Sequence, residues 1–137
     1  MGRVEVKLQV ANNQKVQAVK QGLLPASEAP WFELDAVVDS GSTHLVLPAD
    51  VADRLQLPGS GEVSIRYADR RSGTRRAVEE VRLELQGRQG TYRAMLEPDR
   101  TTALIGAIVL EDLDFLVDCN NQRLVPRDPD RLTAEVE

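Results

Sequence analysis

The chain has 137 residues, which is enough for one domain with a hydrophobic core and too short for two. An apolar share of 42% and a charged share of 28% are ordinary for a globular protein, and a net charge of −5 argues against a general nucleic-acid binder, which usually carries a basic surface. A single cysteine and a single histidine exclude an internal disulfide and any site that needs two histidines from one chain. No segment resembles a signal peptide or is long enough to cross a membrane, so we expect no membrane partner and, by default, a cytoplasmic location.

The first third of the chain is predicted to contain two half-buried strands. Apolar and polar residues alternate over residues 3–10 and again over 31–38. Between them, Asn12-Asn13 indicates a turn, residues 16–24 are ambiguous with a second strand as one option, and residues 24–30, with two prolines, indicate a surface loop.

A short apolar strand and a helix are predicted next, followed by a long hairpin. The strand ends at Pro48, and the helix continues from Ala49 to Leu55 or Leu57, because proline is favoured in a first helical turn. Alternating residues over 62–68 and 74–85 flank a polar, glycine-containing turn at 69–73, which is typical of a β-hairpin.

The last third is predicted to contain short strands and one further helix. Gly87-Arg88-Gln89-Gly90 indicates another hairpin turn, and later segments indicate strands over residues 92–96, 103–107, 115–118 and 122–125 and a helix over 108–113. Residues 1–126 are therefore expected to form one domain, and residues 127–137 a charged tail that is either disordered or helical.

The segment Ala36-Val37-Val38-Asp39-Ser40-Gly41-Ser42 suggests a functional site. Its apolar residues predict a buried strand that ends in a tight loop, with the carboxylate of Asp39 placed where the strand stops. A carboxylate in that position is unfavourable to desolvate unless it is hydrogen-bonded or used. Asp-Ser-Gly is also an ordinary turn sequence, so the segment alone leaves both interpretations open.

A second segment repeats part of this pattern. Leu104, Ile105 and Gly106 form another apolar strand that stops at a glycine before a helix. The order of an apolar strand into Asp39-Ser40-Gly41, a Leu-Val-Leu-Pro strand, a long hairpin, Leu-Ile-Gly and a Val-Leu-Glu-Asp-Leu helix resembles the retropepsin-like aspartic proteases, in particular their single-domain bacterial-type members. The resemblance covers roughly residues 4–126.

The resemblance implies a mainly β fold: a closed acid-protease barrel with one or two short helices, active as a symmetric dimer. It implies an aspartic endopeptidase that activates a water between the Asp39 carboxylates of two copies, without a metal or other cofactor. Ser40 would hydrogen-bond across the two-fold axis, Gly41 would let the two loops approach, and Ser42 would reach the outer carboxylate oxygen. Gly106 would let its strand pack against the acid loop. The partners would be a second copy and an extended peptide or protein substrate.

The resemblance also assigns the long hairpin as a flap that closes over the substrate. Its tip would be formed by Tyr67, Ala68, Asp69, Arg70, Arg71, Ser72 and Gly73. Several arginines lie near this tip, which indicates either a solvated hairpin or a preference for acidic peptides or an acidic partner surface. After the glycine of the second segment, viral members usually carry Arg and then Asn or Asp, whereas this chain has Ala107 and Ile108. An arginine-based interaction at the dimer interface is therefore not expected, and the dimer would be weaker or built otherwise.

Other candidate groups have ordinary explanations. Four acids could suggest a metal site, yet two of them alternate with apolar residues and are better interpreted as the solvated face of a strand: Glu111, Asp112, Asp114 and Asp118. His44 lacks a nucleophile partner, Cys119 lies at a turn, and Tyr67 is either a core residue or a ring that faces the substrate. Three functions remain open: a homodimeric aspartic endopeptidase, a non-catalytic peptide-binding or dimerisation module of the same fold, and a β domain with a chance Asp-Ser-Gly turn.

Overall fold

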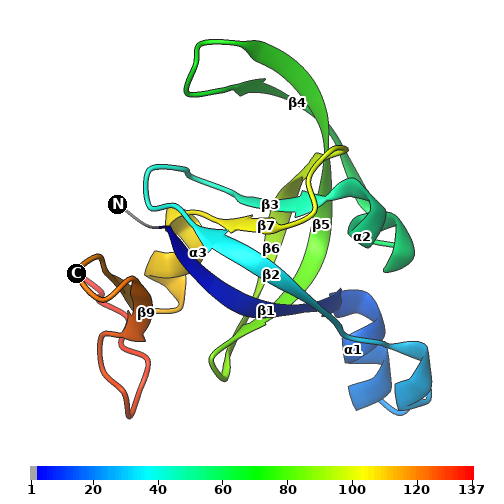
Figure 1. Ribbon diagram of the computed structural model, residues 1–137. Coiled ribbons are helices and arrows are strands. Elements are labelled where there is room, and N and C mark those ends of the chain that lie inside the picture. Colours follow the sequence, from blue (N-terminus) through cyan, green and yellow to red (C-terminus); the bar gives the residue numbers. More distant parts are fainter. Residues whose placement is uncertain (1–2) are drawn as a thin grey trace.

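The structure is a computed structural model that describes residues 3–137; residues 1 and 2 of the predicted domain lie outside this range. Its main sheet has seven strands in the order β1-β2-β7-β3-β6-β5-β4, and β1 also pairs with β5 (Figure 1). Six strands therefore close into a barrel, while β4 pairs with β5 alone. This confirms the predicted mainly β, closed-barrel fold. The strands of this sheet are β1 (Val4–Asn12), β2 (Phe32–Val38), β3 (Leu45–Pro48), β4 (Gly59–Arg66), β5 (Ser72–Leu85), β6 (Arg88–Glu97) and β7 (Ala103–Ile105).

The barrel interior is filled by the apolar residues that alternate along its strands. Leu8, Leu47 and Leu83 have no exposed surface, and the same holds for Ile105. Successive strand residues point to opposite faces, so the alternation seen in the sequence places one set inside. Each fully buried leucine contributes about 1.5–3 kcal/mol relative to an exposed one. The core is thus aliphatic, in keeping with the low aromatic content.

The long hairpin is present and extends away from the barrel (Figure 1). Its two arms pair from Glu62↔Arg76 to Arg66↔Ser72, and the Tyr67 amide donates to the Arg71 carbonyl at 2.9 Å to close the tip. Arg70 adopts a positive φ of 71° in this turn. We call residues 62–76 the flap hairpin.

One predicted strand is a helix instead. Helix α1 (Asn13–Lys20) occupies most of the segment for which a strand was one option, and Asn12-Asn13 is the junction between β1 and α1 rather than a turn. The Asn12 side chain caps the helix, accepting hydrogen bonds from the amides of Gln14 at 3.0 Å and Lys15 at 3.3 Å. Val16 is buried by this arrangement.

The other helices occur where the sequence predicts them. They are α2 (Ala49–Arg54) and α3 (Ala107–Asp112), and a short 3-10 turn, η1 (Ala26–Glu28), interrupts the predicted loop. The turn between β5 and β6 is shorter than predicted: β6 begins at Arg88, which leaves Gln86 and Gly87 as the turn, both with positive φ. Among the described residues no helix is long and apolar enough to cross a membrane.

The C-terminal segment is held in place by a buried carboxylate, that of Asp114. After α3, β8 (Phe115–Asp118) and β9 (Arg123–Pro126) form a separate two-stranded sheet, and residues 131–137 lack regular structure. Asp114 lies between the helix and this sheet and accepts from Arg127 Nε at 2.7 Å and from the Thr133 amide at 3.1 Å.

The prediction that Asp114 lies on a solvated strand face is therefore wrong. It is 8% exposed and precedes β8. The hydrogen bond from Arg127 holds the pKa of the Asp114 carboxyl below its usual range. The tail, expected to be disordered or helical, is instead held by this ion pair and by Arg88, which donates to the carbonyls of Asp128 and Arg131.

Candidate active site

Asp39 lies directly after β2, where that strand runs parallel to β7. Val38 pairs with Ile105, and the Asp39 amide donates to the Ile105 carbonyl at 2.9 Å. The two apolar segments singled out in the sequence are therefore neighbours in the barrel. Asp39 and Ser40 are exposed. The strand pairing thus fixes the backbone of Asp39 and leaves its carboxylate accessible.

The acid loop, residues 39–44, orients this carboxylate with its own groups. The Gly41 amide donates to Asp39 Oδ1 at 3.0 Å, and the Ser42 hydroxyl donates to Oδ2 at 3.1 Å. The Ser42 amide in turn donates to the Asp39 carbonyl at 3.1 Å. Each carboxylate oxygen can accept more than one hydrogen bond, so both keep capacity for a further partner.

Gly106 allows the acid loop to pack on the start of α3. A Cβ atom at this position would lie 2.7 Å from the carbonyl oxygens of both Ser42 and His44. The Ala107 amide donates to the Ser42 carbonyl at 2.7 Å, and the Ile108 amide donates to the Thr43 carbonyl at 3.1 Å. Since these contacts involve backbone on both sides, only a residue without a side chain fits. The close packing that the sequence suggests for Gly106 is present.

Leu104 and Ile105, the other residues of the second segment, belong to β7, which pairs with the strand that leads into the acid loop. Leu104 pairs with Val37 of β2 and with Val46 of β3, so it joins the strands on either side of β7. Ile105 has no exposed surface. Leu104 and Ile105 therefore contribute strand pairing and core packing, whereas Gly106 lets the acid loop approach the backbone closely.

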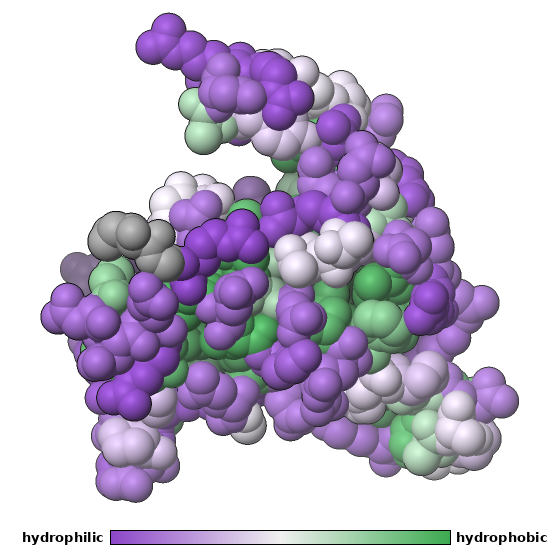
Figure 2. All heavy atoms as spheres, viewed as in Figure 1, coloured by the Kyte–Doolittle hydropathy of each residue, from purple (hydrophilic) through white to green (hydrophobic). Residues whose placement is uncertain are grey.

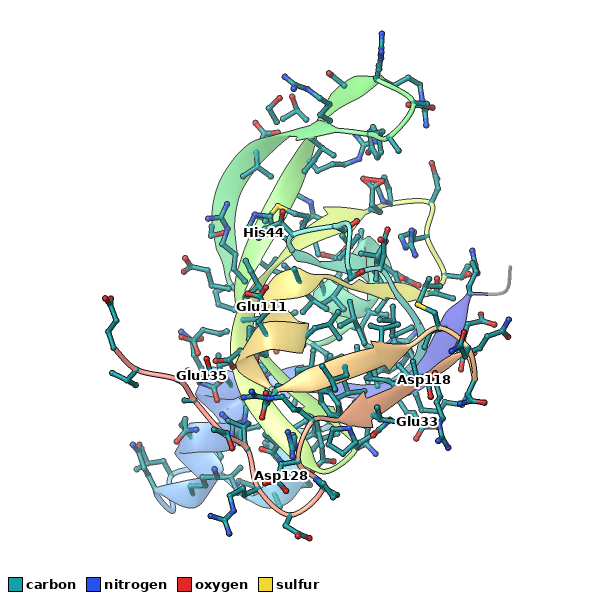
Figure 3. The ribbon with its side chains drawn as sticks, turned by 90° about the vertical axis from the view of Figure 1, so that its left-hand side faces the viewer. Glu33, His44, Glu111, Asp118, Asp128 and Glu135 are labelled. Atoms are coloured by element: carbon teal, nitrogen blue, oxygen red, sulfur yellow. The ribbon has the colours of Figure 1, made fainter. Side chains whose placement is uncertain are left out.

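The flap hairpin lies on the same side of the barrel as the acid loop. His44, at the end of that loop, is seen beneath the hairpin in Figure 3, and Figure 2 shows a hollow between the hairpin and the barrel. His44 itself is exposed. The arrangement has the form expected of a flap above a carboxylate, with room for an extended chain between them.

The flap tip carries fewer unpaired cations than its sequence suggests. The Arg71 amide donates to Asp69 Oδ1 at 3.0 Å and Arg71 Nε donates to Oδ2 at 2.6 Å, and these two hydrogen bonds hold the pKa of the Asp69 carboxyl below its usual range. Arg76 is 3.3 Å from Asp53. At the tip, Ala68, Arg70 and Ser72 are exposed, and Gly73 is half-buried. A preference for acidic peptides stays a prediction.

Tyr67 is not a core residue, and the alternative that its ring faces a substrate stays a prediction. It is half-buried, and its hydroxyl donates to both carboxylate oxygens of Glu97, at 2.6 and 3.0 Å. Arg75 donates to the same carboxylate at 2.7 Å. The sequence analysis missed Glu97, because nothing in its local sequence links it to residues 22 and 30 positions earlier.

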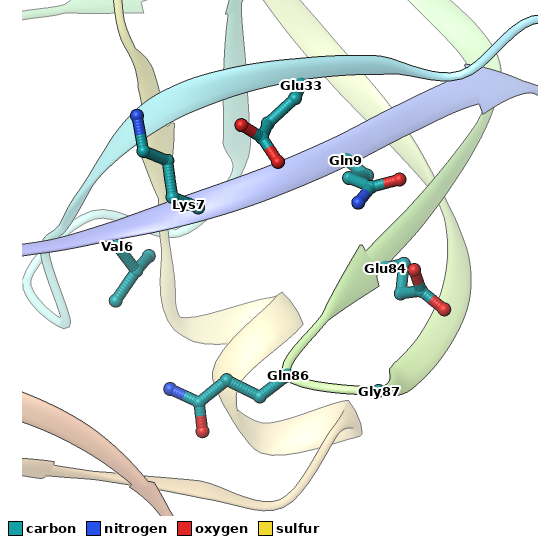
Figure 4. Close-up of a pocket in the computed structure, with 7 residues that line it drawn as sticks. All are labelled: Val6, Lys7, Gln9, Glu33, Glu84, Gln86 and Gly87. Atoms are coloured by element: carbon teal, nitrogen blue, oxygen red, sulfur yellow. The ribbon is translucent and has the colours of Figure 1, made fainter.

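Other polar features lie apart from Asp39. A depression at the barrel surface is lined by Val6, Lys7, Gln9, Glu33, Glu84, Gln86 and Gly87 (Figure 4). None of these residues belongs to the acid loop or the flap hairpin. Cys119 is exposed at the β8–β9 turn. Within residues 3–137, no cluster of three His, Cys, Asp or Glu side chains could hold a metal ion.

The comparisons with known proteins agree with this geometry. Residues 33–109 match the family model for aspartyl protease. The EIAV protease, solved in complex with the inhibitor HBY-793, is 16% identical, with a TM-score of 0.57 over 82% of this chain and 88% of that chain. The simian foamy virus (mac) protease is 18% identical, with a TM-score of 0.45 over 57% of this chain and 80% of that chain. No curated protein sequence matches.

The likeness to the EIAV protease concerns the fold, and it confirms the predicted retropepsin-like barrel. The family match spans more than half of the chain and contains the acid loop, the flap hairpin and Gly106. These findings and the geometry around Asp39 lead to one conclusion: the chain belongs to the aspartyl protease family.

Proposed function

We propose that the protein is an aspartic endopeptidase that acts as a homodimer, with Asp39 of each copy forming half of the catalytic pair. The observation that carries this proposal is the exposed Asp39 carboxylate, held at both oxygens by its own loop and backed by Gly106. Ordinary Asx turns also accept such hydrogen bonds, as Asp69 does from Arg71, so the position of the carboxylate at the end of β2, in a loop packed on Gly106, is what favours a catalytic role.

The chemistry requires two carboxylates around one water. When two carboxyl groups lie close together they cannot both ionise, so they share a proton. The ionised group takes a proton from the water, whose oxygen attacks the peptide carbonyl carbon, while the protonated group donates a hydrogen bond to the carbonyl oxygen. The sequence contains one Asp-Ser-Gly, so the second carboxylate has to come from another copy.

The acid loop has features suited to such a pair. A Cβ on Gly41 would lie 3.2 Å from Asp39 Oδ1, so glycine keeps space beside the carboxylate for a partner loop. Ser40 is exposed and is available to hydrogen-bond across the two-fold axis. Ser42 occupies Oδ2 and fixes the orientation of the carboxylate.

Two exposed apolar residues support the proposed dimer. Ile108 is 42% exposed although its amide is bonded to the acid loop, and Leu116 of β8 is 51% exposed. Ala107 and Ile108 follow Gly106 at the positions where the resemblance implies Arg and then Asn or Asp in viral members. An apolar contact would therefore replace the arginine-based interaction. The edges of the small β8–β9 sheet offer further pairing sites to a second copy.

The substrate would be an extended peptide between the flap hairpin and the two acid loops. A strand-like chain can satisfy its backbone groups by hydrogen bonds to both, and closure of the hairpin excludes bulk water from the carboxylates. This mechanism uses no metal or other cofactor.

Substitution of Asp39 tests the proposal. We expect Asp39→Asn to lower the rate of peptide cleavage roughly a thousandfold or more, because the amide cannot accept the proton of the attacking water. Asp35→Asn is the matched control, since Asp35 lies on β2, the strand that leads to Asp39, is exposed and pairs with Lys7. Equal cleavage by Asp39→Asn and the parent would refute the proposal. Tight binding of extended peptides by the parent without cleavage would favour the alternative, a peptide-binding module.

A further inference from the structure

Glu97 lies where the flap hairpin separates from the barrel. The pairing of β5 with β6 ends at Ala77↔Met95, and β6 itself ends at Glu97. Beyond this point the hairpin extends away from the barrel (Figure 1). Arg75 Nε donates to Glu97 Oε1 at 2.7 Å, and the side chains are only 31% and 20% exposed, respectively. This ion pair therefore connects the base of the flap hairpin to the rim of the barrel.

Tyr67 brings the far end of the hairpin to the same carboxylate. It follows Val63 and Ile65 on the less exposed face of the hairpin, whereas Ser64 and Arg66 are exposed. From there its hydroxyl donates to Glu97 at 2.6 Å, and the bond to this carboxylate raises the pKa of the phenol.

Two cations flank the Tyr67 ring. The guanidinium carbons of Arg71 and Arg75 lie 5.2 and 5.8 Å from its centroid. Cations at this distance from an aromatic face are attracted to it. One carboxylate, one phenol and two guanidinium groups thus form a compact cluster between the tip and the base of the hairpin.

We propose that Tyr67, Arg75 and Glu97 form a latch that holds the flap hairpin in its raised position in the free protein and has to open before the hairpin can close over a bound peptide. The inference rests on the proposed function for its consequence in cleavage, but the latch itself is a property of the free chain. Apart from the half-buried Gly73, the rest of the tip is exposed, and among the described side-chain hydrogen bonds it makes none to the barrel. Glu97 is thus the point of attachment for the tip.

The latch has a direct consequence for substrate binding. If only the unlatched form can close over a peptide, the observed affinity falls in proportion to the fraction of molecules that are unlatched. Charge-assisted hydrogen bonds to a half-buried carboxylate are stronger than those of exposed pairs, so this fraction is small in the parent protein. Loss of the phenol hydroxyl should therefore raise the observed affinity without altering the chemistry at Asp39. Tyr67, Arg75 and Glu97 are positioning residues.

Amide hydrogen exchange of the free protein tests the latch without reference to cleavage. We expect the amides of residues 63–74 to exchange about tenfold faster in Tyr67→Phe and in Glu97→Gln, while those of β1 and β2 are unchanged. Tyr92→Phe is the matched control for the phenol, because Tyr92 also donates to a carboxylate, that of Asp112, away from the flap hairpin. Glu79→Gln is the control for the carboxylate, since Glu79 is exposed on β5. Parent-like exchange in both latch variants would overturn the proposal.

Peptide cleavage kinetics test the consequence. We expect Tyr67→Phe to lower KM several-fold with kcat unchanged, and Tyr92→Phe to leave both unchanged. A raised KM together with a lowered kcat would overturn the latch as a barrier to closure of the hairpin. Absence of cleavage by the parent protein would refute the proposed function, whereas the exchange result would still decide whether the latch exists.

Discussion

Gly106→Ala probes the contact between the acid loop and the second apolar segment. The new Cβ would lie 2.7 Å from the carbonyl oxygens of Ser42 and His44 and 2.8 Å from the Thr43 carbonyl carbon. All three are backbone atoms, so none can move away by a change of rotamer. The φ of Gly106 is −96°, which alanine adopts readily, and the effect therefore comes from space alone.

The expected loss of stability follows from the cost of overpacking. An extra methyl group in a well-packed region costs about 1–3 kcal/mol, and the upper part of this range applies here because backbone has to shift on both sides. At this chain length each kcal/mol lowers Tm by roughly 3–6 °C. The shift also displaces the Asp39 carboxylate, since the Asp39 amide is bonded to Ile105, the neighbour of Gly106. We expect cleavage to fall even at temperatures where the variant is folded.

Differential scanning calorimetry of Gly106→Ala and Gly59→Ala provides the measurement. Gly59 is the matched control, because a Cβ there meets no atom within 4 Å. We expect a clear fall in Tm for Gly106→Ala and little change for Gly59→Ala. If both variants unfold at the temperature of the parent, the close packing of the acid loop on Gly106 is refuted.

Two further predictions concern the attachments of the C-terminal tail and helix α1. Asp114, whose pKa is lowered by Arg127, stabilises the fold above the usual carboxyl pKa of about 3.9 and loses this effect as the pH falls through its folded pKa. In Arg127→Gln we expect the pKa of Asp114 to rise, as measured by NMR titration of its carboxyl carbon; an unchanged pKa would contradict the ion pair. Asn12→Ala should lower the free energy of unfolding by about 2–3 kcal/mol in urea denaturation, since Asn12 caps α1 and donates to the carbonyls of Leu55 and Gln56. Asn120→Ala, at an exposed turn, should have little effect, and equal losses in the two variants would contradict this role.

The strands of the barrel could be predicted from the sequence because their burial alternates with a period of two. Val4, Val6, Leu8 and Val10 all lie on one face of β1, so only one orientation of this strand turns its apolar side chains toward the core. The same holds for β5 near Leu83. Helix α1 was missed because its valines are also typical of strands. Its start signal, Asn12 before a segment with Val16 and Val19 on one face, was available and should have outweighed them.

In the site, only contacts between residues that are close in the sequence could be predicted. Asp39, Gly41 and Ser42 interact within the acid loop, so their arrangement follows from three or four consecutive residues. Glu97 and Asp114 have partners that only tertiary structure brings near: Tyr67 and Arg75 for the first, Arg127 for the second. The spacing of apolar residues along the sequence gives no information on such long-range contacts. The alternating pattern around Asp114 predicted a solvated strand surface. That prediction is wrong because the C-terminal tail covers this residue.

Subunit mixing tests most directly the proposal that two copies of Asp39 share one site. The parent chain is mixed with increasing amounts of the Asp39→Asn variant, unfolded and refolded together so that the subunits exchange, and peptide cleavage is measured at a constant amount of parent. If each site needs an Asp39 from both copies, a ninefold excess of the variant should reduce cleavage to about one tenth, because most parent chains are then in mixed dimers. The same excess of Asp35→Asn should leave the activity of the parent undiminished. Cleavage that stays constant at every ratio of the Asp39→Asn variant would contradict the shared site.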